Sequence, residues 1–176
     1  EFEPYEVVAT TYQAISGAGK TFKDWPEMVE NIIPYIGGEE EKSEMEPLRL
    51  WGEIEDGVIV PAKEPVITCQ CVRVPVLRGH SESIYIETKK TIDMDKVFEL
   101  LGNSTGIDLC DDLANQVYPM PTSFIGDELT HVGRVRKDLY KDNALSLWIT
   151  GDQLMKGAAY NSVDIGLKMI ELGLLK

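Results

Sequence analysis

Residues 66–89 have the sequence VITCQCVRVPVLRGHSESIYIETK, which contains two successive runs with the character of β-strands. The first run, residues 66–76, is rich in β-branched residues and predicts one long strand. The second run, residues 81–89, alternates Ile84 and Ile86 with Tyr85 and Glu87, a pattern typical of a half-buried strand. We therefore expect these two strands to be prominent in the sheet.

The rest of the chain mixes strands and helices without strict alternation of the two. This order favours an α+β domain, with a largely antiparallel mixed sheet and helices packed on one of its faces. Further strands are expected at residues 5–13, 131–137 and 144–150, and a loop or short hairpin at residues 53–65. Helices are expected from Asp24, with Met28, Val29, Ile32 and Ile33 at helical spacing; over residues 39–51, with a kink or new start at Pro47; from Asp93 to Leu101; and over residues 154–172.

The composition is that of a single acidic globular domain of 176 residues. A net charge of −13 argues against binding to nucleic acid, which requires a basic face. No apolar run approaches the roughly 20 residues that span a bilayer, so no membrane association is expected. The three cysteines, Cys69, Cys71 and Cys110, have no paired spacing and indicate reduced thiols in a cytoplasmic protein. Because residue 1 is Glu and no leader is visible, we expect a processed chain or a piece of a longer one.

Arg73 and His80 are the first candidates for chemistry. Strand alternation places Cys69, Cys71 and Arg73 on one face, with His80 following at the strand end. A fixed guanidinium beside a titratable imidazole suits a site that holds an anion and moves a proton. The alternative is an arginine that lies over the sheet and extends its head to water. A metal site at the two cysteines is not expected, because no further ligand lies at a suitable spacing.

Three other features carry weaker signals. The loop Ser16-Gly17-Ala18-Gly19 lets backbone N–H groups approach a phosphate, although a tight turn is the simpler explanation. Lys42, Glu46 and Arg49 share one face of the helix over residues 39–51, where they present alternating charge to a zwitterionic substrate or form a solvated surface. His131 is expected to be structural or exposed rather than catalytic.

Five motifs follow one another along the chain: residues 11–19 (TYQAISGAG), 71–83 (CVRVPVLRGHSES), 118–121 (YPMP), 132–138 (VGRVRKD) and 152–159 (DQLMKGAA). Together, and in this order, they resemble the motifs of the aspartate-semialdehyde dehydrogenase family. The resemblance covers nearly the whole chain, so it is far more specific than any one motif.

The resemblance implies a particular half of such an enzyme. The family has an N-terminal Rossmann domain that binds NADP and carries a nucleophilic cysteine, and this chain has neither signature. Residues 1–176 are therefore expected to be the C-terminal catalytic and dimerisation domain, similar to that of glyceraldehyde-3-phosphate dehydrogenase. The helix over residues 154–176 is expected to pack back toward the missing domain. The family also implies a homodimer or homotetramer that uses the exposed face of the sheet, and no activity for this piece alone.

The resemblance further implies roles for individual residues in converting aspartyl phosphate to the semialdehyde and phosphate through a cysteine thioester. His80 is the expected acid and base, and Gln13 positions the reacting centre. Rival members of the superfamily are malonyl-CoA reductase, against which Glu46 counts, and N-acetyl-glutamyl-phosphate reductase. The remaining expectations are Arg73 for the substrate carboxylate, Glu46 for its amino group, Arg49 and Lys42 as further substrate-binding cations, and Ser16, Gly17 and Gln153 for the NADP cofactor.

Overall fold

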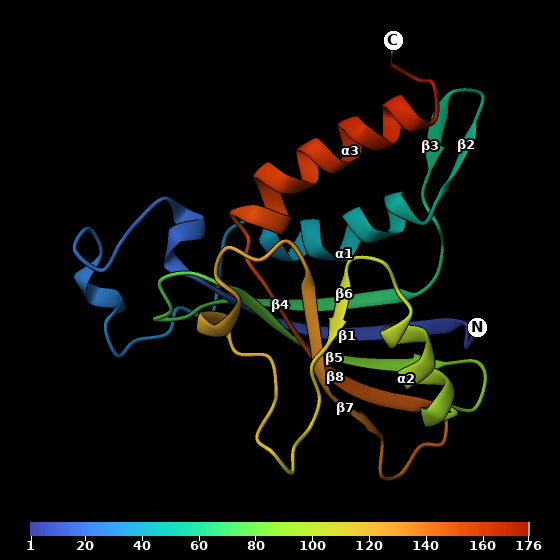
Figure 1. The fold of residues 1–176 in the computed structure, drawn as a ribbon, viewed down its shortest axis with the longest axis horizontal. Helices are drawn as coiled ribbons and strands as arrows, with labels where there is room; N and C mark the ends of the chain where they lie inside the picture. Colours follow the sequence, from blue (N-terminus) through green and yellow to red (C-terminus); the bar gives the residue numbers. More distant parts are fainter. Residues whose placement is uncertain (176) are drawn as a thin grey trace.

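The computed structural model describes residues 1–175, in which six strands form one mixed sheet with the order β4-β1-β5-β8-β7-β6. β1 runs parallel to β4, β6 runs parallel to β7, and the other neighbours are antiparallel (Figure 1). The sheet strands are β1 (Pro4–Gln13), β4 (Val66–Arg73), β5 (His80–Thr88), β6 (Ile107–Leu109), β7 (Thr130–Lys137) and β8 (Ala144–Gly151), and the separate hairpin consists of β2 (Glu53–Glu55) and β3 (Val58–Val60).

The core lies on one face of this sheet. The register sets Ala9 beside both Cys69 and Ile84, and Ile84 beside Leu147, so these side chains share a face. α1 (Glu39–Leu50) packs over the β4 end of that face, where its Ser43 hydroxyl lies 3.7 Å from the Cys71 sulfur. α2 (Met94–Gly102) covers the other end through a cluster that contains Ile92, Val97, Val132, Val135 and Leu145. Two helices on one face of a mixed sheet confirm the expected α+β class.

Among residues 1–175, no α-helix packs on the opposite face of the sheet. There the ring of Tyr12 lies 5.2 Å from that of Trp148, and the Trp148 indole donates to the Pro119 carbonyl oxygen at 3.1 Å. Thr68, Gln70 and Ser83 on the same face are exposed. This face is therefore polar and aromatic, whereas the core face is aliphatic.

The outer edge of β4 is closed by carboxylates from α1. Glu44 accepts a hydrogen bond from the Cys69 backbone N–H at 3.0 Å, and Glu40 accepts from the Cys71 N–H at 3.2 Å. The spacing matches because residues four apart on a helix share a face, as do residues two apart on a strand. α1 continues through Pro47, whose carbonyl accepts from Trp51, so the helix over the predicted region is one element and no new helix starts at Pro47.

The prediction of a helix that starts at Asp24 is wrong. Only a three-residue 3₁₀ turn, Pro26–Met28, forms there. The chain then extends, and Ile33 exchanges two backbone hydrogen bonds with Arg73, at 2.9 and 3.0 Å. The apolar spacing was misleading because Met28 is buried whereas Val29 and Ile32 are exposed, so no continuous apolar face exists. The same pairing accompanies the end of β4 at Arg73, three residues before the predicted strand end.

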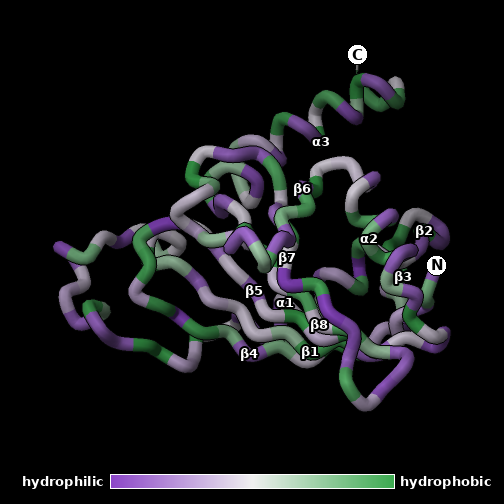
Figure 2. The backbone as a smooth tube through the Cα atoms, turned by 60° about the horizontal axis from the view of Figure 1, so that its bottom comes forward, coloured by the Kyte–Doolittle hydropathy of each residue, from purple (hydrophilic) through white to green (hydrophobic). Residues whose placement is uncertain are grey.

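The last helix begins as a π-helical turn, Met155–Ala159, and continues as α3 (Tyr160–Glu171). No residue of α3 is buried, and Figure 2 shows the helix projecting away from the sheet with hydrophobic and hydrophilic residues alternating along it. Asp93 caps α2 as predicted, accepting from the backbone N–H groups of Asp95 and Lys96. Across residues 1–175, no helix is long and apolar enough to cross a membrane.

Candidate active site

The ends of four strands meet at one edge of the sheet. The parallel strands β1 and β4 both finish there, and the register pairs their last residues, Gln13 and Arg73. The antiparallel arrangement brings the first residue of β5, His80, beside the last residue of β8, Gly151. The sheet topology thus places Gln13, Arg73 and His80 close together, although they are separated along the sequence.

Arg73 is a buried cation without an acidic partner. The residue is 6% exposed, and its Nη1 atom donates to the Ala14 carbonyl oxygen at 2.7 Å. Gly17 lies against the guanidinium, since a Cβ at this position would be 3.3 Å from Nη1. Among the described residues, no carboxylate lies within ion-pair distance of Arg73. Burial lowers the pKa of Arg73 and the nearby charge of Glu39 opposes that effect, but a guanidinium remains charged near neutral pH. A buried, unpaired charge is costly, so this position favours an anionic ligand.

Glu39, at the start of α1, is the carboxylate that faces this region. Its Oε2 atom accepts a hydrogen bond from the Gln13 amide at 3.4 Å, and its Oε1 atom accepts from Lys42 at 3.1 Å. The hydrogen bond from Lys42 is the main cause that holds the pKa of Glu39 below its ordinary value; Gln13 and the Arg73 charge contribute. Sequence reasoning missed Glu39. Its spacing of three from Lys42 was the available signal, but it lies in an acidic run typical of a solvated helix end.

Glu46 and Arg49 lie further along α1 than Glu39. Both are exposed, and with Leu50 and Ile59 they line a separate hollow between the helix and the β2–β3 hairpin. Neither makes a hydrogen bond or an ion pair with Gln13, Arg73 or His80 within residues 1–175. Of the three charged residues predicted on α1, the structure therefore brings only Lys42 into the network around Gln13.

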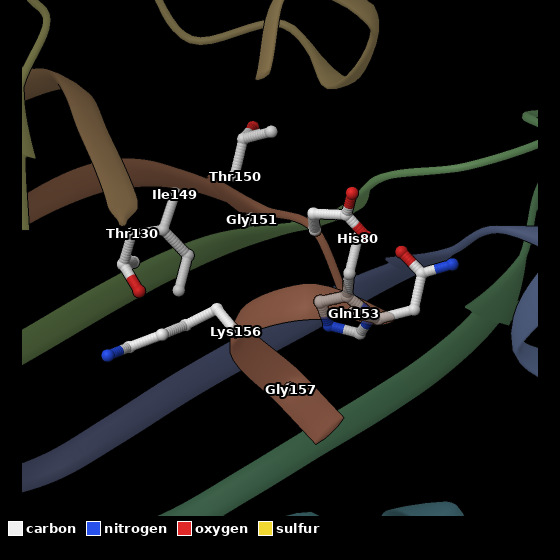
Figure 3. A pocket seen from close by; sticks show the side chains of 9 residues that line it. His80, Thr130, Ile149, Thr150, Gly151, Gln153, Lys156 and Gly157 are labelled. Carbon is white, nitrogen blue, oxygen red and sulfur yellow. The ribbon is translucent and has the colours of Figure 1, made fainter. Parts of the chain in front are cut away.

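His80 has a carboxylate partner on its own strand. Its Nε2 atom lies 2.9 Å from Glu82 Oε1, with side chains that are 27% and 26% exposed. A carboxylate in this position orients an imidazole. His80 also lines a cavity of about 310 Å³ together with Thr130, Ile149, Gln153 and Lys156 (Figure 3). Sequence reasoning missed Glu82, although strand alternation puts it on the same side as His80.

Gln153 joins the loop after β1 to the turn before His80. Its amide nitrogen donates to the Ser16 hydroxyl at 2.7 Å, and its amide oxygen accepts from the Gly79 backbone N–H at 3.0 Å. The structure thus brings Ser16 and Gln153 together, and Gly17 adjoins Arg73. These residues form one continuous rim with His80.

The cysteines do not belong to this rim. Cys69 and Cys71 are buried beside α1, and burial, with the neighbouring Cys71, raises the pKa of Cys69 to about 12. Burial also raises the pKa of Cys110. A protonated thiol is a poor nucleophile. Within residues 1–175, no cluster of three or more histidine, cysteine or acidic side chains is arranged to hold a metal ion.

His131 has a structural position. It is 2% exposed, its Nδ1 atom lies 2.9 Å from Asp108 Oδ2, and its ring stacks on Phe124 with 3.5 Å between the ring centroids. It holds the loop after Pro121–Phe124 against the sheet face that carries no helix.

Comparisons with known proteins agree with the arrangement of strands and loops. Residues 1–156 match the family model described as "Semialdehyde dehydrogenase, dimerisation domain". The chain is 35% identical over 181 residues to the aspartate-semialdehyde dehydrogenase of Prochlorococcus marinus, an alignment that covers 90% of this chain and 52% of that protein. With the aspartate-semialdehyde dehydrogenase of Bacillus subtilis it shares 33% identity over 199 residues, covering 97% of this chain and 57% of that protein.

Solved structures give the same picture. The structure of aspartate-semialdehyde dehydrogenase with NADP from Candida albicans superposes with a TM-score of 0.82 at 26% identity, covering 99% of this chain and 53% of that chain. Aspartate-semialdehyde dehydrogenase II complexed with ASA from Vibrio cholerae superposes with a TM-score of 0.79 at 27% identity, covering 96% and 55%. The chain thus spans about half the length of the relatives that it matches.

Proposed function

Because this chain belongs to the semialdehyde dehydrogenase dimerisation-domain family, we propose that it is the C-terminal part of an NADP-dependent aspartate-semialdehyde dehydrogenase. The longer chain that it completes is called the complete polypeptide below. The proposed reaction converts aspartyl phosphate, NADPH and a proton to aspartate semialdehyde, NADP and phosphate. The observation that carries the proposal is the buried, unpaired Arg73 at the same sheet edge as the His80–Glu82 pair.

Arg73 is suited to the carboxylate of the amino-acid substrate. A guanidinium presents parallel N–H donors that match the two oxygens of a carboxylate, and these bonds are strong where water is excluded. One N–H group is already fixed on the Ala14 carbonyl, which orients the rest of the fork. Arg73 therefore binds and orients the substrate and takes no proton.

His80 is suited to proton transfer at the reacting carbon. It removes the proton from the attacking thiol, which lies outside these 176 residues, and returns a proton when phosphate leaves. Glu82 keeps the imidazole oriented while it transfers protons. Gln13 borders the same space and supplies an amide near the developing oxyanion.

Glu39 fits the substrate amino group better than Glu46 does. Glu39 lies within hydrogen-bond distance of Gln13, whose strand neighbour is Arg73, whereas Glu46 lines the separate hollow. Lys42 beside Glu39 places a cation where a phosphate group can be drawn in. A carboxylate and two cations around one space match a zwitterionic phosphorylated substrate, whereas malonyl-CoA offers no amino group.

NADP would meet this domain at Gln153 and Ser16. The Gln153 amide lines the cavity beside His80 and donates to the Ser16 hydroxyl, an arrangement that fits the amide-bearing end of a nicotinamide. When bound, NADPH supplies the hydride. The rest of a dinucleotide needs the domain that residues 1–176 lack, so this chain alone should not turn over substrate.

α3 and the sheet face without helices are the proposed contact surfaces. Val163, Leu167 and Ile170 of α3 are 58%, 61% and 59% exposed and lie on one side of the helix, which we assign to the N-terminal half of the complete polypeptide. The sheet face with Tyr12 and Trp148 is assigned to a second copy, giving a homodimer that could pair again into a tetramer. Three free cysteines fit a reducing, cytoplasmic setting.

The test is an assay of the purified 176-residue chain beside the complete polypeptide, with aspartate semialdehyde, phosphate and NADP as reactants and NADPH absorbance as the signal. Turnover is expected only from the complete polypeptide. Activity of the short chain alone would contradict the division of the site between two halves. Reduction of malonyl-CoA or N-acetyl-glutamyl phosphate in place of aspartyl phosphate would reassign the substrate.

The two glutamates give a matched pair of variants. Glu39→Gln should raise the KM for aspartyl phosphate by roughly tenfold, because a charge-assisted hydrogen bond to an ammonium group is worth about 1.5–3 kcal/mol and the amide retains part of it. Glu46→Gln should leave KM within about twofold, since an exposed charge away from the substrate contributes little. The reverse order of effects would assign the amino group to Glu46.

A further inference from the structure

Asp152, next to Gln153, is an almost fully buried carboxylate. Its side chain is 1% exposed, and Oδ2 lies 2.7 Å from Arg78 Nη2. Oδ2 also accepts from the Gly126 backbone N–H at 2.7 Å, and Oδ1 accepts from the Leu154 N–H at 2.9 Å. Both oxygens are thus occupied, so Asp152 borders the cavity beside His80 without a free oxygen to offer a substrate.

The donors to Asp152 come from three segments. Arg78 lies in the turn between β4 and β5, two residues before His80, and Gly126 lies in the loop after the 3₁₀ turn Pro121–Phe124. Leu154 follows Asp152 itself after the end of β8. A second bond runs beside the first, because Gly79 donates to Gln153. The turn that carries His80 is therefore tied to the end of β8 by two adjacent contacts, one of them ionic.

The turn also has little room to move. Gly79 has φ of +102°, a conformation that suits glycine, and a Cβ there would lie 2.6 Å from the Pro121 Cβ. Pro121 belongs to the same loop that Gly126 anchors to Asp152. The loop, the turn and the end of β8 thus converge on one carboxylate.

Charge makes this contact more than a packing arrangement. Burial by itself would raise the pKa of Asp152, but hydrogen bonds from Arg78, Gly126 and Leu154 outweigh it and hold the pKa below its ordinary value. The carboxylate is therefore ionised at neutral pH. Loss of Arg78 leaves this charge buried without its partner, and loss of Asp152 removes the only acidic partner of Arg78 within residues 1–175.

We propose that Asp152 and Arg78 are a pair of positioning residues that hold His80 and Gln153 in their working arrangement. The proposal rests on the proposed function, since it concerns the same site. Neither residue touches the reacting atoms. The pair acts through the backbone of the turn, setting where the His80 imidazole stands relative to the Gln153 amide, and a misplacement of about 1 Å costs roughly 100-fold in rate.

The experiment compares Asp152→Asn, Arg78→Met and the double variant in the complete polypeptide. Each single variant should lower kcat about 10- to 100-fold while the KM for aspartyl phosphate stays within about threefold, because Arg73 and Glu39 remain in place. The double variant should be no slower than the worse single variant, since the two residues act as a unit. Arg78→Lys, which keeps the charge, should recover part of the loss.

Asp142→Asn is the matched control. Asp142 lies 2.9 Å from Lys137 in an exposed pair, and its loss should leave kcat unchanged. All rates are divided by the folded fraction from thermal unfolding. The proposed positioning role would be contradicted if Asp152→Asn kept a kcat near wild type per folded molecule. It would also be contradicted if the decreases in kcat of the two single variants multiplied fully in the double variant.

Hydrogen exchange separates this inference from the proposed function. The Gly79 amide should exchange at least tenfold faster in Asp152→Asn than in wild type. Unchanged exchange would contradict the positioning role of Asp152 and Arg78, whatever the catalytic activity of the variant. If the wild-type complete polypeptide has no activity on aspartyl phosphate, the proposed function fails, and the exchange result alone then decides whether the pair holds the turn.

Discussion

Replacing His80 with alanine is expected to lower the kcat of the complete polypeptide by about 100- to 10,000-fold, the range typical of a lost general acid–base group. His80 is the only histidine at the sheet edge where β1, β4, β5 and β8 meet, and the other histidine in the sequence, His131, is buried against Phe124 on the opposite face. No neighbouring imidazole can replace it. Stopped-flow and steady-state measurements of NADPH formation give kcat directly.

The variant should fold normally, because His80 is about a quarter exposed and its partner Glu82 lies only two residues away on the same strand. An unfolding midpoint close to that of wild type is the control for this point. Glu82→Gln should lose less activity than His80→Ala, because the glutamine amide can still hydrogen-bond to the His80 ring although the negative charge of Glu82 is lost. Wild-type kcat in His80→Ala would remove His80 from the mechanism.

Arg73→Lys is expected to lower kcat/KM for aspartyl phosphate by roughly 10- to 150-fold, which corresponds to one charge-assisted hydrogen bond of about 1.5–3 kcal/mol. Lysine keeps the charge but cannot present two parallel N–H groups to a carboxylate, and it gives up the bond to the Ala14 carbonyl oxygen. The loss should fall mainly on KM, because the substrate carboxylate stays distant from the reacting carbon.

Arg73→Met sharpens the test, since it removes the cation from a position that is 6% exposed. This variant should use aspartyl phosphate worse than Arg73→Lys, and its unfolding midpoint should fall little, because a buried charge without a partner does not stabilise the free protein. Equal kinetics in wild type and Arg73→Lys would show that the carboxylate binds elsewhere.

Local patterns were sufficient for most of the fold. β-branched runs located β1, β4, β7 and β8, and Asp93 marked the start of α2, because strand pleating and helix capping depend on residues close in sequence. The helix predicted from Asp24 failed for the opposite reason. The conformation of this segment depends on a contact with a residue distant in sequence. Ile33 forms two backbone hydrogen bonds with Arg73, forty residues away at the edge of β4, and these bonds favour an extended chain.

The residues of the candidate site differ in the same way: some are visible in the local sequence and others only in the fold. Arg73 and His80 could be proposed as candidates from the sequence because they share one short stretch with a recognisable chemical pattern. Glu39 was missed because only the fold shows which turn of an acidic helix lies beside Gln13. The Arg78–Asp152 pair joins residues seventy-four apart, and nothing in either local sequence shows that they meet.

The carboxylates of α1 along the edge of β4 limit how copies of this protein can meet. A bare edge strand recruits other strands, and that route leads to endless side-by-side growth. Here Glu40 and Glu44 occupy the outward N–H groups of Cys69 and Cys71, so this edge of the sheet offers fewer free backbone donors to a strand of another molecule. The same helix carries Glu39, which accepts a hydrogen bond from Gln13, and Lys42, which pairs with Glu39. Sliding α1 along β4 would therefore uncover the edge and move Glu39 away from Gln13, so the protection of the edge and the contact with Gln13 depend on one helix register.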